Sequence, residues 1–145
     1  MIPENNQITR QIRIGNIYMV YFEGNNNEQS GYRPGLVIQN NAGNRFSPNL
    51  IVLPLTSSIK KQSQPTHVVI KADNSGLRKD SMVICENPVC ISKNKLGRYV
   101  TTLSNDYMSK IAEAYILATS VISFLPIEMM AGIMKKAINL NSVSV

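Results

Sequence analysis

The sequence predicts one mainly β domain that is followed by helices at its C-terminal end. The chain has 145 residues, a length for which a single domain is the default. Short runs of β-branched, aromatic and aliphatic residues alternate with turns rich in Asn, Gly and Pro through the first two thirds. After Ser104 the apolar residues recur at helical spacing instead. Short strands at this spacing indicate a small barrel or sandwich.

The first strand is predicted over residues 12–22, where two alternating sets of apolar side chains suit a strand with both faces covered. Residues 23–31 are polar and Asn-rich, and predict a mobile loop longer than the usual hairpin connection. Turns at residues 40–43, 64–65 and 73–76 separate the strands that follow. These strands are predicted at residues 35–39, 50–55, 67–71, 82–86 and 99–103.

Two helices are predicted after the last strand. Ser104 has the character of an N-cap, with Asp106 in the first turn. The stripe that follows has the spacing of a core-facing helix, and its members are Tyr107, Met108, Ile111, Ala112, Tyr115 and Ala118. Pro126 interrupts the chain, and residues 127–138 can form a second amphipathic helix.

Composition describes a soluble globular protein with a mild preference for nucleic acid. Hydrophobic residues make up 43% of the chain and charged residues 17%. The net charge of +6 and the pI near 9.5 suit a polyanionic partner, although a generic basic surface has the same composition. Several of the cations lie in or near predicted loops, namely Lys60, Lys61, Lys71, Arg78, Lys79, Lys93, Lys95 and Arg98.

The sequence also indicates where the protein works and which cofactors it lacks. No apolar run reaches the roughly 18 residues of a membrane helix, and the N-terminus has no basic start before an apolar stretch, so we expect a cytoplasmic protein. Cys85 and Cys90 stand with a single His, which is too few ligands for a zinc site. We therefore expect no metal, and two buried free thiols.

An acid, a cation and a hydroxyl gather near two predicted neighbouring strands. Arg33 precedes Pro34, which predicts a rigid turn just before the strand, and Thr56 follows the strand at 50–55. A guanidinium beside a hydroxyl suits a phosphodiester, because its planar fork donates two hydrogen bonds to phosphate oxygens. Glu28 is the best candidate for a base. A structural ion pair remains the alternative for Arg33.

Other polar and aromatic residues have competing interpretations. His67 is expected to pack or hydrogen-bond at a strand start, since one His cannot supply a two-histidine mechanism. Phe46 can stack on a base or pack in the core. Lys60 suits a phosphate contact, yet surface lysines are usually only solvated. Ser57 and Ser81 have the positions of turn or strand-edge hydroxyls.

Several ordered motifs over residues 13–120 resemble the MazF/PemK family of toxin endoribonucleases from type II toxin–antitoxin modules. They are Glu-Gln-Ser-Gly-Tyr-Arg-Pro at 28–34, Leu-Val-Ile-Gln-Asn at 36–40, Gly-Asn-Arg-Phe-Ser-Pro at 43–48, Pro-Leu-Thr-Ser at 54–57 and Leu-Arg-Lys-Asp-Ser at 77–81. Several blocks in order make the resemblance more specific than one short motif.

The resemblance implies a small SH3-like β-barrel of the MazF/CcdB toxin type, acting as a homodimer with a cognate antitoxin as partner. It implies metal-independent, sequence-specific cleavage of single-stranded RNA, with no cofactor. By position it implies that Arg33, Thr56 and Glu28 are catalytic. The residues expected to bind RNA are Phe22, Gln29, Asn40, Phe46, Ser57, Lys60, Ser81 and Asn87.

The chain departs from the resemblance in two places. Asn87, Pro88 and Val89 stand where relatives commonly carry Gln, Ile and Arg, so we expect a different choice of bases. Residues 124–145 form an extension of the single 1–145 domain that the resemblance does not explain. The alternative functions are a non-catalytic toxin of the same fold that inhibits gyrase and a passive single-strand binder. The gyrase inhibitors use a Trp-bearing C-terminal end, and this chain has no Trp.

Overall fold

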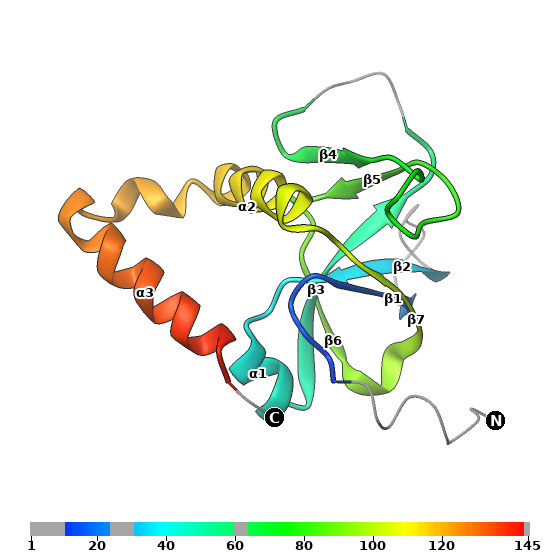
Figure 1. Ribbon diagram of the computed structural model, residues 1–145, viewed down its shortest axis with the longest axis horizontal. Coiled ribbons are helices and arrows are strands. Elements are labelled where there is room, and N and C mark those ends of the chain that lie inside the picture. Colours follow the sequence, from blue (N-terminus) through cyan, green and yellow to red (C-terminus); the bar gives the residue numbers. More distant parts are fainter. Residues whose placement is uncertain (1–10, 24–30, 60–63, 144–145) are drawn as a thin grey trace.

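The computed structural model describes residues 11–23, 31–59 and 64–143 and confirms a mainly antiparallel β fold with helices at the C-terminal end (Figure 1). In this part of the chain seven strands form one sheet of order β4-β5-β3-β2-β1-β7, and β6 pairs with β3 beside this path. The strands are β1 (Asn16–Phe22), β2 (Gly31–Val37), β3 (Asn49–Thr56), β4 (His67–Ile70), β5 (Ser81–Ile84), β6 (Val89–Ser92) and β7 (Leu96–Thr102). The helices are α1 (Asn41–Phe46), α2 (Asn105–Thr119) and α3 (Met130–Asn141), with 3₁₀ turns η1 (Lys93–Lys95), η2 (Val121–Phe124) and η3 (Ile127–Met129).

Strand β1 is covered on both faces along most of its length, as its two alternating apolar sets predict. Ile17 belongs to one hydrophobic core, whereas Tyr18, Val20 and Phe22 belong to a second core on the other face. The antiparallel register with β2 pairs Ile17 with Leu36 and Val20 with Arg33. Side chains opposite one another in such a pair point to the same face, so the register decides which residues of β2 are buried.

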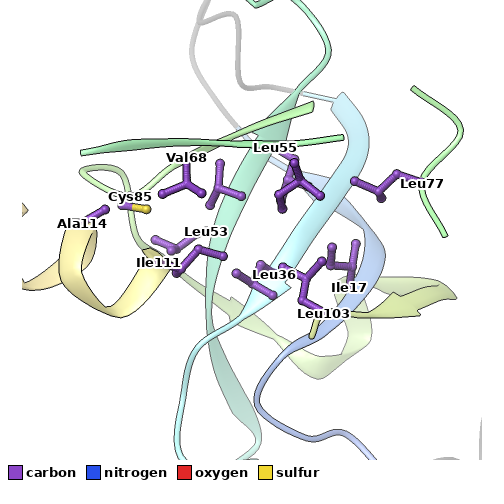
Figure 2. Close-up of a cluster of buried hydrophobic side chains, with 12 residues drawn as sticks. Ile17, Leu36, Leu53, Leu55, Val68, Leu77, Cys85, Leu103, Ile111 and Ala114 are labelled. Carbon is purple, nitrogen blue, oxygen red and sulfur yellow. The ribbon is translucent and has the colours of Figure 1, made fainter. Parts of the chain in front are cut away.

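The first core joins the sheet to helix α2 and to the β4–β5 loop. Figure 2 shows Ile111 and Ala114 of α2 at one end of this cluster and Leu77 of the loop at the other, with strand residues between them. Leu36, Leu53 and Leu55 are almost completely buried there. Burying a leucine side chain stabilises the fold by about 1.5–3 kcal/mol relative to leaving it exposed. The core therefore fixes both the strands and the loop that border the site described below.

Helix α2 begins where the sequence predicts. The Ser104 side chain accepts a hydrogen bond from the Tyr107 backbone N–H at 3.3 Å, which satisfies one of the free donors of the first turn. Of the predicted stripe, Ile111 is buried, and Tyr107, Met108 and Tyr115 pack against the first core. The prediction that Ala112 lies in the core was wrong. Ala112 is exposed, and Ala114 occupies the buried face instead because it lies three residues from Ile111.

The predicted turn at Arg33 was also wrong, because β2 begins at Gly31 and Arg33 lies inside the strand. Pro34 is tolerated there because β3 pairs with β2 only over Gly35–Val37. One side of β2 is therefore an edge at Pro34, where the missing N–H costs no ladder hydrogen bond. Two further elements were not predicted: helix α1 replaces the turn at residues 40–43, and the short strand β6 follows Pro88.

The C-terminal segment lies apart from both cores. Figure 1 shows α3 (orange to red) running back from the far end of α2 toward α1. Helix α3 begins at Met130 after a 3₁₀ turn, close to the predicted start at residue 127, and contains no buried residue. Its end is tied to α1, because Asn41 donates hydrogen bonds from its backbone N–H to Asn141 Oδ1 (3.1 Å) and from Nδ2 to the Asn141 carbonyl (3.0 Å). No helix in the described ranges is long and apolar enough to cross a membrane.

A basic groove where the sheet divides

The candidate site lies where strands β2 and β3 separate. These strands pair at Gly35–Pro54, Leu36–Leu53 and Val37–Val52. Beyond Gly35, β2 continues beside β1, whereas β3 turns to pair with β5, with Thr56 opposite Met82. Extending the β2–β3 register by two residues would set Arg33 opposite Thr56. The division of the sheet therefore opens a gap, with Arg33 of β2 on one side and Thr56 of β3 on the other.

A groove of about 740 Å³ fills this gap, and both Arg33 and Thr56 line it. Its cations come from three elements: Arg33 from β2, Arg78 and Lys79 from the β4–β5 loop, and Arg98 from β7. The remaining lining residues are mostly apolar or carry hydroxyl groups, and they are Met19, Tyr32, Pro34, Leu55, Ser57, Ser58, Leu77, Ser81 and Val100. No lining residue that the structure describes carries a negative charge. The cations of such a groove attract a polyanion, and its apolar side chains can contact any apolar groups attached to that polyanion.

The Thr56 hydroxyl is oriented by the backbone that follows it. The Ser58 N–H donates a hydrogen bond to Thr56 Oγ1 at 3.1 Å, which closes a small turn at the end of β3. Because the oxygen accepts this bond, the single hydroxyl proton can be donated elsewhere. Thr56 therefore presents a positioned donor to an oxygen atom in the groove.

The β4–β5 loop that carries Arg78 and Lys79 is held by several contacts. The Leu77 side chain is buried in the first core, and Thr101 Oγ1 donates to the Ser75 carbonyl at 2.8 Å. Gly76 has φ +86°, and an added Cβ would lie 2.4 Å from Thr101 Oγ1, so no larger residue fits. These contacts place the two cations at the groove as parts of an ordered loop.

Asp80 ties the other end of the same loop. Its Oδ1 accepts the Ala72 N–H at 2.7 Å, and its Oδ2 lies 3.5 Å from Lys71 Nζ. The Ala72 hydrogen bond holds the pKa of Asp80 below its ordinary value; burial opposes this shift and Lys71 supports it. The ionised carboxylate is therefore the form that closes the loop.

The structure brings together four of the residues predicted for the site: Arg33, Thr56, Ser57 and Ser81. Ser81 Oγ also donates to the Lys79 carbonyl at 3.0 Å, which fixes the loop where it enters β5. Glu28, Gln29 and Lys60 lie outside the described residues.

The other predicted RNA-binding residues do not line this groove. Phe22 is 6% exposed and packs in the second core. Asn40 caps α1, its Oδ1 accepting the Gly43 N–H at 2.8 Å. Phe46 is 73% exposed on α1 with the Arg45 guanidinium 5.1 Å from its ring centre, so it is not a core residue. Asn87 lies in the turn between β5 and β6.

Sequence reasoning did not assign Arg78, Lys79 and Arg98 to the site. The signal for the first two was present, because the Leu-Arg-Lys-Asp-Ser block supported the family resemblance. Arg98 was predicted to lie in or near a loop before a strand at residues 99–103, but it lies inside β7 (Leu96–Thr102). Strand β7 pairs with β1, which in turn pairs with β2, and this order brings Arg98 toward Arg33.

His67 forms a hydrogen bond at the start of β4, as predicted. Its Nε2 lies 2.6 Å from Glu86 Oε1, and the residue is not part of the groove lining. Partial burial raises the pKa of Glu86. Hydrogen bonds, of which the one from His67 has the largest effect, lower the pKa by more than burial raises it, so the net shift is downward. The contact between His67 and Glu86 lies at the end of the β4–β5 ladder, where His67 pairs with Ile84.

The two thiols differ in exposure. Cys85 is fully buried, and burial raises the pKa of its thiol to about 12, with a further contribution from the charge of Glu86. The prediction that Cys90 is buried was wrong, since its side chain is exposed on β6. In the described part of the chain, no group of three or more His, Cys, Asp or Glu residues could hold a metal ion.

Comparison with known proteins assigns this chain to a family. The profile described as "PemK-like, MazF-like toxin of type II toxin-antitoxin system" matches residues 13–118. Endoribonuclease EndoA of Bacillus subtilis (strain 168) is 43% identical over 97 residues, which span 67% of this chain and 84% of EndoA.

Solved structures share the fold. An endoribonuclease from a mycobacterial species superposes with a TM-score of 0.64 at 23% identity, covering 81% of this chain and 97% of that one. A mycobacterial endoribonuclease in complex with its cognate antitoxin gives 0.63 at 24% identity, covering 76% and 96%. The chain therefore belongs to the MazF/PemK family of type II toxin–antitoxin toxins. Within that family it is a MazF-like toxin endoribonuclease, related to EndoA.

Proposed function

We propose that the groove cleaves single-stranded RNA in a sequence-specific manner and without a metal ion, with the RNA's own 2′-OH as nucleophile. The observation that supports this most is that Arg33 and Thr56 lie on opposite sides of a cationic groove. A guanidinium and a hydroxyl together supply fixed positive charge and a hydrogen-bond donor, which a phosphorane needs.

The proposed reaction is an internal transfer at phosphorus. The 2′-oxygen forms a bond to phosphorus while the bond from phosphorus to the 5′-oxygen breaks, which leaves a 2′,3′-cyclic phosphate and a 5′-OH. A base accepts the proton of the 2′-OH and an acid returns a proton to the 5′-oxygen. Arg33 and Thr56 stabilise the charge on the non-bridging oxygens. Glu28 is proposed as the base.

The groove has further cations that can bind the phosphates on either side of the cut. Arg78, Lys79 and Arg98 line the groove in addition to Arg33, so phosphates that flank the cut have positive charge within the same cavity. Contacts to phosphate release bound counterions, with a slope near 0.7 per contact for single strands in a plot of log affinity against log salt. We therefore expect RNA binding to weaken steeply as salt is added.

We also propose that the protein acts in the cytoplasm as a homodimer and is held in check by a cognate antitoxin. The antitoxin is supported by the mycobacterial relative that was solved in complex with its own. Because the groove's cations attract acidic as well as nucleic-acid chains, an antitoxin segment laid across it would compete with RNA.

The test is to incubate a long RNA of known sequence with the protein in EDTA and to map the new 5′ ends. Wild-type protein should produce a small set of sites, and Lys135→Ala should produce the same set because it removes a positive charge from α3 rather than from the groove. Arg33→Ala should leave nearly all of the RNA uncut over the same incubation time. RNA that is bound but not shortened by the wild type would contradict the proposal and favour a binding toxin.

A further inference from the structure

Two exposed tyrosines form a cross-strand pair at the outer end of β1 and β2. The register sets Tyr21 opposite Tyr32, on the same face as Ile17 and Leu36, which are buried in the first core. Their ring centres are 4.5 Å apart at an angle of 38° between the planes. Tyr21 is nevertheless 57% exposed and Tyr32 45% exposed. The apolar face of the sheet thus ends in two aromatic rings that no core covers.

The Tyr32 ring lies in close contact with the β7 backbone at Gly97. A Cβ added to Gly97 would lie 2.1 Å from Tyr32 Oη and 2.8 Å from two ring carbons. Glycine at position 97 leaves room for the ring in this position, where it crosses from β2 over β1 to reach the β7 backbone, and a larger residue would make the ring shift. A ring that already packs against a backbone on one side has less conformational entropy to lose when a ligand stacks on it than a fully solvated ring.

The Tyr32 ring lies in the same groove as the cations. Tyr32 lines the groove together with its neighbour Arg33 and with Arg98, which follows Gly97. An aromatic face next to cations that track a phosphate backbone is the arrangement by which proteins hold single-stranded nucleic acid. Successive side chains of a strand leave its opposite faces, but Tyr32 and Arg33 both line the groove where the sheet divides, so one RNA strand lying in the groove can meet both.

We propose that Tyr32, supported by Tyr21 and by the Gly97 contact, is a stacking platform for one unpaired base beside the phosphate held at Arg33. The inference rests on the proposed function of the groove and adds a specific subsite to it. Tyr32 acts by positioning the RNA strand and takes no part in the proton transfers. Its phenol oxygen is dispensable for stacking, whereas its ring is not.

The first experiment measures the affinity of a non-cleavable RNA that carries one mapped site with a 2′-deoxy nucleotide at the cut. Tyr32→Leu should bind about 5- to 150-fold more weakly, which is the range that loss of one stacked base predicts. Tyr32→Phe should bind within about twofold of wild type. Gly97→Ala should resemble Tyr32→Leu, because its Cβ displaces the ring. Phe124→Leu is the matched control, since Phe124 is an exposed aromatic in the extension.

The second experiment identifies the stacked base with RNAs that are abasic at one position at a time. At one position next to the cut, the abasic RNA should weaken wild-type binding as much as Tyr32→Leu does, and the variant should lose nothing further. 2-Aminopurine at that position should be quenched when wild-type protein binds, a readout that needs no variant to fold. Equal affinity of Tyr32→Leu and wild type, or no quenching at any position, overturns the inference while leaving RNA cleavage intact. Failure of wild-type protein to cleave RNA would instead overturn the proposed function and this subsite together.

Discussion

The sheet and the C-terminal extension use apolar residues in opposite ways. Strands β1 and β3 send side chains into two cores, and the groove beside them is lined by cations, hydroxyl groups, one tyrosine and several apolar side chains. Helix α3 buries none of its residues, and its segment exposes large apolar side chains, among them Phe124, Ile127, Met134 and Ile138. The difference follows the family boundary, since the matched region ends at residue 118.

The contrast shows which region determines the chemistry. The groove is built on strands whose register is fixed by buried residues on both faces, so the side chains there are held in place. An isolated helix shorter than about 12–15 residues is marginal in water. The C-terminal end of α3 is held by the hydrogen bonds between Asn141 and Asn41, by one of 3.4 Å from Arg13 Nη2 to the Asn141 carbonyl, and by a few neighbouring contacts. We therefore expect stability and cleavage to depend on the sheet and only weakly on α3.

The largest expected difference is in stability. Leu53→Ala removes a fully buried side chain and should lower the free energy of unfolding by about 2–5 kcal/mol. Ile133→Ala on α3 should change it by no more than about 0.5 kcal/mol, since the residue is exposed. Urea unfolding monitored by circular dichroism measures both values. Equal losses would mean that α3 is part of the cooperative core.

The next largest difference is expected in the rate of RNA cleavage, which should depend on residues of the sheet. Arg33→Ala and Thr56→Ala should each slow cleavage by about 100- to 1000-fold, because each removes a positioned donor to the phosphorane. Arg33→Lys should also slow cleavage substantially, since a point charge does not reproduce the planar fork. Single-turnover rates on one mapped RNA provide the measurement, with melting temperature as the check on folding. A well-folded Arg33→Ala protein of full activity would remove the mechanism.

A smaller effect is expected at the anchor of α3. Asn141→Ala removes the acceptor of the Asn41 N–H and should cost about 1 kcal/mol, confined to α3. Hydrogen exchange should then accelerate at α3 amides while the strands and the cleavage rate stay as in wild type. Faster exchange in the strands as well, or a fall in the cleavage rate, would show that the extension is coupled to the groove.

The smallest expected effect concerns pH and the loop that carries Arg78 and Lys79. Because the pKa of Asp80 is lowered in the folded protein, its carboxylate stabilises the fold above the ordinary value of 3.8. This contribution is lost as pH falls through the lower folded-state pKa. Asp80→Asn should therefore melt below wild type at pH 7, and the two should converge as the pH drops below about 4. A difference that persists at pH 2 would assign it to packing rather than to charge.

Much of this arrangement could be predicted from the sequence. Period-two and helical patterns gave the mainly β order and the N-cap at Ser104, and the family motifs placed Arg33 and Thr56 together. Local patterns failed where long-range pairing decides. Pro34 indicated a turn, but it lies in a strand because β3 leaves β2 at that point. Arg98 and the Tyr32–Gly97 contact depend on the strand order, which spacing along the chain does not reveal.

The most direct test of the central claim uses two versions of one RNA that contain a mapped site, in the presence of EDTA. One is all-ribose, and the other has a single 2′-deoxy nucleotide on the 5′ side of the cut. We predict that the all-ribose RNA is cleaved to a 2′,3′-cyclic phosphate and a 5′-OH, and that the deoxy RNA is bound with similar affinity but not cleaved at that position. Cleavage of the deoxy RNA at an equal rate, or complete loss of cleavage of the all-ribose RNA in EDTA, would contradict it.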